Sequence, residues 1–186
     1  LRPGYVLPRH DFWNPYTHTQ LKRINKMIKQ IFSVLAGLAI ALPAGATSWQ
    51  DVNSLVELVE QTGTTVSIQN CTQEGVMGYY SYDPQNSIDL MAICKNAVNM
   101  QDADAVWEVV SHEATHVMQA CQAGPVIADS HVPRVLRELQ EMAPHYYATL
   151  QGYRGDHKRL ELEAFWMELR STSAVMDWMI TYCFQE

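Results

Sequence analysis

Hydrophobic residues recur with helical spacing in the segment that begins at Ser48 and ends before Gly63. The residues on its apolar face are Val52, Leu55, Val56 and Val59. Three segments rich in β-branched and aromatic residues follow, and they predict strands at residues 64–69, 78–82 and 87–93. The sequence DPQN between the last two is typical of a hairpin turn.

The rest of the chain carries helical patterns that glycine and proline divide. A helix begins after Asp102, a favourable N-cap, and ends before Gly124. Pro133 starts a second helix, which Pro144 interrupts or ends. Residues 156–184 are helical in pattern, with a break near the middle. The order helix, strands, helices predicts an α+β domain.

The first 46 residues follow none of these patterns. Residues 27–46 read MIKQIFSVLAGLAIALPAGA, with a basic start, an apolar run and an A-x-A end, which are the parts of a secretory signal peptide. The apolar run is shorter than the ~20 residues of a membrane helix. We expect cleavage after Ala46, no membrane anchor afterwards, and a secreted or periplasmic domain at residues 47–186. Residues 1–26 are interpreted as an upstream leader, with Met27 the natural start. The alternative is a long n-region of the signal peptide, with charges at Lys22, Arg23, Lys26 and Lys29.

Without this N-terminal segment the domain is strongly acidic. The chain has 13 Lys and Arg and 20 Asp and Glu. Residues 1–46 contain six of the basic residues and one of the acidic residues. Residues 47–186 therefore have 7 basic and 19 acidic residues, a formal net charge of −12. Such a charge opposes binding to phosphate backbones and anionic membranes, so nucleic acid is excluded as a partner.

All four cysteines lie in the expected exported domain. An even number of cysteines in an exported protein favours disulfides, and none of the spacings resembles the CxxC pair of a zinc site. We expect the pairs Cys71–Cys94 and Cys121–Cys183.

Residues 112–116 read HEATH, and this motif carries the candidate chemistry. Residues four apart on a helix lie one above the other, so His112 and His116 can bind one zinc ion. Glu113 can reach a zinc-bound water and take its proton as general base. This combination on a helix is typical of a metallopeptidase.

Catalytic zinc takes three protein ligands, so one more residue is needed. In the extended motif with a third histidine, that histidine would stand at Gln122, which excludes the subclass. Glu161 and Glu163 are two apart on a helix, so only one can face the zinc. Glu163 lies on the more apolar stripe, where a carboxylate needs a metal or a charged partner. We favour Glu163 as ligand; the alternatives are Glu161 as ligand and a pairing of Glu163 with Arg159 or Arg170.

HEATH followed by Glu163-Ala164 on a later helix resembles the gluzincin group of zinc metallopeptidases. The resemblance implies Zn²⁺ held by His112, His116 and Glu163, with Glu113 as general base. It also implies a small zincin-like domain, in which a short mixed sheet with an edge hairpin packs on the HExxH helix beside C-terminal helices. Residues 78–94 are similar to that hairpin.

The expected function is therefore an exported zinc metallopeptidase that acts on a peptide or protein substrate. We expect an extended substrate to pair with the strand at residues 87–92. Further residues that could stabilise an oxyanion are Tyr146, Tyr147, Tyr153 and His157. The alternatives are a catalytically inactive, zinc-stabilised binding or inhibitory module, and a disulfide-linked structural domain without metal.

Overall fold

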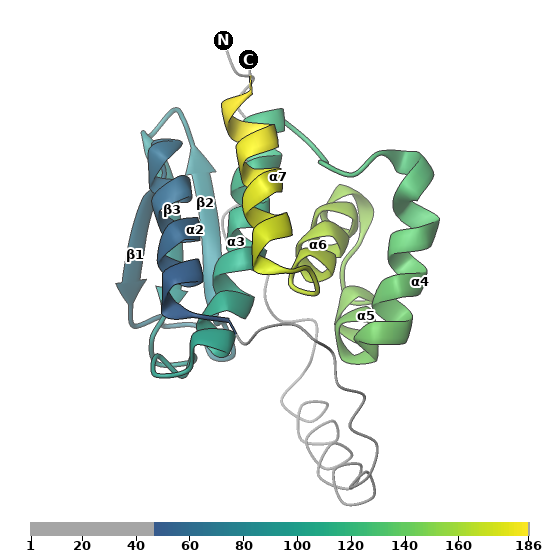
Figure 1. The fold of residues 1–186 in the computed structure, drawn as a ribbon, viewed down its shortest axis with the longest axis horizontal. Coiled ribbons are helices and arrows are strands. Elements are labelled where there is room, and N and C mark those ends of the chain that lie inside the picture. Colours follow the sequence, from purple (N-terminus) through teal and green to yellow (C-terminus); the bar gives the residue numbers. More distant parts are fainter. Residues whose placement is uncertain (1–46, 186) are drawn as a thin grey trace, which may run out of the picture. The chain divides into compact units, whose positions relative to one another are not determined.

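The computed structural model describes residues 47–185, so the predicted leader and signal peptide lie outside the described residues. The described part is a small α+β domain with six α-helices and one mixed sheet, as the pattern predicts (Figure 1). Its elements are α2 (Trp49–Gln61), β1 (Thr65–Gln69), β2 (Gly78–Asp83), β3 (Ile88–Cys94), α3 (Ala103–Gln122), the 3₁₀ turn Asp129–His131, α4 (Val132–Met142), α5 (Pro144–Leu150), α6 (Gly155–Met167) and α7 (Thr172–Phe184).

Local chemistry sets where the helices begin and end. Ser48 caps α2 in a reciprocal capping box with Asp51. Asp102 accepts backbone N–H groups at the start of α3, and Ser171 does the same for α7. Ala123 ends α3 in the left-handed conformation, with φ of 55°. The helix boundaries expected from capping residues and prolines are thus confirmed.

The sheet has the strand order β1-β3-β2. β1 runs parallel to β3, whereas β2 is antiparallel to it. The turn between β2 and β3 is closed by Asp83, whose Oδ1 accepts the backbone N–H groups of Gln85 and Asn86. The predicted hairpin is therefore confirmed.

The expectation that a substrate pairs with residues 87–92 is wrong. β3 lies between β1 and β2, and the backbone groups on both of its sides are engaged by these neighbours. A further strand can add only to the edge of a sheet. β2, which pairs with β3 on one side only among the described strands, is the edge strand that packs against α3.

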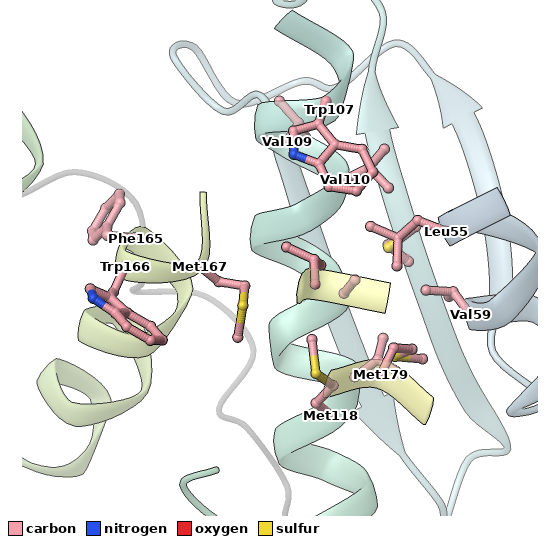
Figure 2. Packing of buried hydrophobic residues seen from close by; sticks show 14 of the residues in the cluster. Leu55, Val59, Trp107, Val109, Val110, Met118, Phe165, Trp166, Met167 and Met179 are labelled. Carbon is pink, nitrogen blue, oxygen red and sulfur yellow. The ribbon is translucent and has the colours of Figure 1, made fainter. Parts of the chain in front are cut away.

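One hydrophobic core joins the sheet to the helices. α2 and α3 both contact the sheet, α6 and α7 pack on α3, and α4 and α5 pack on α6 (Figure 1). Figure 2 shows Leu55 and Val59 of α2 facing α3, and Met118 of α3 near Met179 of α7. α3 is therefore the central helix, and 12 of its 20 residues are buried. Among residues 47–185, no helix combines the length and apolar character of a membrane span.

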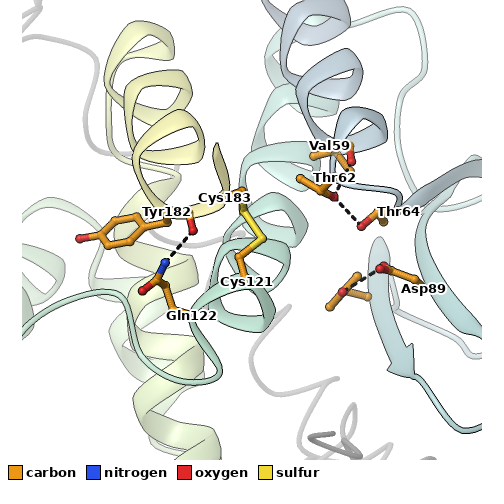
Figure 3. Close-up of a disulfide and its surroundings, with 9 residues drawn as sticks. Val59, Thr62, Thr64, Asp89, Cys121, Gln122, Tyr182 and Cys183 are labelled. Carbon is orange, nitrogen blue, oxygen red and sulfur yellow. Dashed lines mark hydrogen bonds between the residues drawn. A yellow bond between two sulfur atoms is a disulfide. The ribbon is translucent and has the colours of Figure 1, made fainter. Parts of the chain in front are cut away.

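Both expected disulfides are present. Cys71–Cys94 joins the segment after β1 to the end of β3. Cys121–Cys183 joins the last turn of α3 to α7, beside the hydrogen bond from Gln122 to the carbonyl oxygen of Tyr182 (Figure 3). The pairing therefore fixes the C-terminal end of the motif helix.

Loss of the longer disulfide should destabilise the domain more than loss of the shorter one. The bridges close segments of 62 and 23 residues, and loop-closure entropy then gives about 4 kcal/mol for Cys121–Cys183 and about 3.5 kcal/mol for Cys71–Cys94. Urea denaturation of the two double Cys→Ala variants, followed by circular dichroism, measures both free energies of unfolding. An inverted order would contradict this entropic account.

Candidate metal centre

α3 carries the two histidines and the glutamate of the motif in its buried middle. Four-residue spacing places the rings of His112 and His116 edge to face, with centroids 5.1 Å apart. His112 is 5% exposed and Glu113 is 2% exposed, while His116 is partly exposed. The helix therefore presents both imidazoles toward the neighbouring helix α6, as expected.

Glu161 of α6 completes the cluster. Its Oε2 lies 3.4 Å from Nε2 of His112, and its Oε1 lies 3.6 Å from Nε2 of His116. One ligand atom from each of the three residues lies within 4.8 Å of the others. The described residues thus contain a His₂Glu set that could hold a metal ion.

The spacing of these atoms fits a metal ion better than direct hydrogen bonds. An N–H···O hydrogen bond spans about 2.7–3.2 Å, which is shorter than both imidazole–carboxylate distances. Ligand atoms at ~2.0–2.1 Å from a tetrahedral zinc ion stand about 3.4 Å apart. The distances from Glu161 to the two histidines are therefore close to the separation that a shared small cation imposes.

Glu163, the favoured third ligand, is not brought to the histidines. Its carboxylate pairs with Arg159 at 2.7 Å and accepts the backbone N–H groups of Val126 and Ile127 at 2.8 and 3.0 Å. The amide of Gln119 donates a further hydrogen bond at 3.0 Å. The alternative pairing with Arg159 is the one observed, because four donors already satisfy this fully buried carboxylate.

The choice of Glu163 from the more apolar stripe fails because the C-terminal half of α6 is buried on every side. All residues from Glu161 to Met167 are buried, so the more apolar stripe does not identify the face toward the histidines. A different signal was available: Glu161 shares its stripe with His157, Phe165 and Glu168. Phe165 lies 5.0 Å from the ring of His112, and both His157 and Glu168 act electrostatically on the cluster. A stripe with three titratable residues marks the site better than hydrophobicity does.

A second carboxylate from the end of α6 orients His112. Oε1 of Glu168 lies 2.6 Å from Nδ1 of His112, so the ring can donate its Nδ1 proton there. When the ring is neutral, the lone pair is then on Nε2, which faces Glu161; metal-binding histidines require this arrangement. Tyr146 donates to Glu108 and also interacts with Glu168, which extends the network behind the histidine.

Burial dominates the electrostatics of the cluster. It raises the pKa of Glu113 to about 8, with further upward contributions from Glu161 and Glu168 and a downward one from His112. Burial alone lowers the pKa of His112, but the interactions with the carboxylates of Glu161 and Glu168 outweigh it and hold the pKa well above its ordinary value. Burial lowers the pKa of His116. The cluster therefore binds a proton at His112 where a metal ion would otherwise balance the carboxylates.

Of the four further candidates, two face Glu161. Burial raises the pKa of Tyr153, and the charges of Glu161 and Glu113 raise it further. His157 lowers the pKa of Glu161 by its charge. Tyr146 is engaged by Glu108, and Tyr147 packs against the core.

The edge strand β2 meets the motif helix at Gly78. A Cβ atom at this position would lie 2.5 Å from Cγ1 of Val109 and 3.0 Å from Oε1 of Glu113. Only glycine allows so close an approach of the strand to the helix. The free edge of the sheet therefore begins beside the candidate general base.

The chain belongs to the family described as "Domain of unknown function (DUF8637)", whose sequence profile matches residues 48–184. Neither the curated proteins nor the solved structures contain a significant match to the chain. Because the family description states no activity, the function is argued from the geometry of the site.

Substitution of the two neighbouring glutamates should separate binding from stability. Glu161→Gln should weaken zinc binding by more than roughly tenfold, because one charged ligand is lost. Glu163→Gln should leave zinc affinity little changed but lower the free energy of unfolding by roughly 3 kcal/mol, because Arg159 loses its buried partner.

Competition with a chromophoric chelator measures the affinity, and urea denaturation measures the stability. The opposite result, with zinc binding lost in Glu163→Gln and kept in Glu161→Gln, would exclude Glu161 as the third ligand.

Proposed function

We propose that this domain is an exported zinc-dependent peptidase of the gluzincin type. The observation that carries the proposal is the set His112, His116 and Glu161 around one point, with Glu113 beside it on the same helix. Two imidazoles and one carboxylate are the ligand set of His₂Glu catalytic zinc sites, which leave a fourth position open.

Zinc is favoured over other metals by the donor set together with the motif. Imidazole also suits copper, iron and nickel, so the ligands alone do not select one metal. A glutamate directly after the first histidine adds a base at the metal, which is the feature that hydrolytic zinc sites need.

In the proposed reaction, a zinc ion held by His112, His116 and Glu161 would supply an acidified water and would polarise the scissile carbonyl. Glu113 accepts the proton of the attacking water and passes it to the leaving amine. Burial raises the pKa of Glu113 to about 8 in the metal-free chain. A zinc ion beside Glu113 would lower that pKa, so that the carboxylate is ionised and able to accept the proton. Tyr153, whose hydroxyl group faces Glu161, is placed to donate to the developing oxyanion.

The edge of β2 supports binding of an extended peptide. Strand addition supplies backbone hydrogen bonds without selecting a particular sequence, and side chains then occupy neighbouring pockets. Because β2 touches α3 at Gly78, a peptide paired with β2 passes close to Glu113.

Two disulfides support the exported location that the proposal includes, since such bonds persist in oxidising compartments. A fold of the zincin type is also part of the proposal, and the support for it is a mixed sheet whose antiparallel edge strand packs on the motif helix.

The burial of the ligands favours a second candidate function. The side chains of His112, His116 and Glu161 are only 6%, 12% and 4% exposed. Structural zinc sites are closed in this way, whereas catalytic sites admit substrate. The second candidate is therefore a zinc-stabilised binding or inhibitory module without turnover.

Glu113→Gln distinguishes the two functions. In a peptidase, this variant should lose roughly 10²–10⁴-fold in hydrolysis of a peptide library, because the general base is removed. It should still bind close to one equivalent of zinc, measured by metal analysis, since Glu113 is not a ligand.

The control is Glu141→Gln, a charge-matched change at an exposed residue of α4. Undiminished hydrolysis in Glu113→Gln would contradict the mechanism. A wild-type chain that binds zinc and cleaves no library member would establish the second candidate instead.

A further inference from the structure

Gln119 lies one turn beyond His116 on α3 and is 5% exposed. Its Oε1 lies 2.8 Å from Nδ1 of His116. Its Nε2 lies 3.0 Å from the carbonyl oxygen of Leu160 and 3.0 Å from Oε2 of Glu163. The amide oxygen thus contacts the histidine, and the amide nitrogen contacts two oxygen atoms of α6.

The partners of the amide fix its orientation. A backbone carbonyl is always an acceptor, and a carboxylate paired with Arg159 is an acceptor as well. Nε2, which has two protons to donate, must face these two oxygens, so Oε1 must face His116. The proton on the imidazole of His116 therefore resides on Nδ1, and Nε2 carries the lone pair.

The same amide also sets the position of the third ligand. Leu160 and Glu163, its two acceptors, lie on either side of Glu161 along α6. A displacement of α6 along α3 would break both hydrogen bonds before the Glu161 carboxylate moved far from the imidazoles. Gln119 thus bonds to one ligand directly and to the helix that carries another.

We propose that Gln119 is the positioning residue of the metal centre: it selects the metal-binding tautomer of His116 and holds α6 at the register that brings Glu161 to the histidines. The proposal rests on the metal site of the proposed function, and it concerns binding rather than turnover.

The test compares Gln119→Met with Gln122→Met in the full chain. Gln122 is three residues further along α3 and donates to the carbonyl oxygen of Tyr182 at 2.6 Å, so it joins the same helix to α7 without touching a ligand (Figure 3). Competition with a chromophoric chelator gives the affinities for Zn²⁺ and Co²⁺. Long-range ¹H–¹⁵N spectra of the metal-free chain give the tautomer of His116.

Gln119→Met should bind zinc roughly 10–100-fold more weakly than the wild type, as expected for loss of a residue that orients a metal ligand. Gln122→Met should bind as the wild type does. In the metal-free spectra, His116 should be protonated on Nδ1 in the wild type and in Gln122→Met, and should lose this preference in Gln119→Met.

If Gln119→Met does not fold, Gln119→Asn replaces it in the test. Asparagine keeps an amide but is one methylene too short to reach both His116 and α6. It should also weaken zinc binding. Wild-type affinity in folded Gln119→Met or Gln119→Asn, or an unchanged His116 tautomer there, would overturn the proposal. Zinc binding without hydrolysis in the wild type would overturn the peptidase alone, and the two variants would still decide the role of Gln119.

Discussion

The packing of α3 against α6 depends on how buried carboxylates are compensated. Glu113, Glu161 and Glu163 are each at most 3% exposed. A buried carboxylate is costly unless donors or a cation neutralise it. Glu163 has four donors, whereas Glu161 faces two imidazole nitrogens at distances longer than a hydrogen bond. The two neighbouring glutamates thus differ in what they need: Glu163 is satisfied by donors of the protein, and Glu161 requires a protonated imidazole or a metal ion.

The remaining elements hold this helix pair in place. Cys121–Cys183 fixes the end of α3 to α7, and Gly78 lets the edge strand lie against the middle of α3. Glu168 and Gln119 each hold one histidine through its Nδ1 atom, so both Nε2 atoms converge on Glu161. Such support for ligand orientation is what tuned metal sites share, whatever their function.

Access to the site separates the two proposed functions. The ligand set, the adjacent base and the edge strand β2 support a peptidase, whereas the small exposed fractions of the ligands support a closed, structural site. His116 is the most exposed of the three ligands, so a substrate would approach from its side of the cluster.

The sequence by itself determined the features that local geometry controls. Caps and prolines placed the helices because they act on neighbouring backbone groups, and the four-residue spacing paired His112 with His116 because a helix repeats every 3.6 residues. The α+β class and both disulfides were also predicted correctly. Two choices needed the tertiary structure.

The first choice was which glutamate joins His112 and His116 in the cluster. The C-terminal half of α6 is buried on every side. Whether Glu163 contacts Arg159 or the histidines therefore depended on the register of α6 against α3, which no periodicity encodes. The second was which strands lie at the edges of the sheet. Strand order in a sheet follows from long-range pairing, and β1 closes the side of β3 that local sequence leaves open.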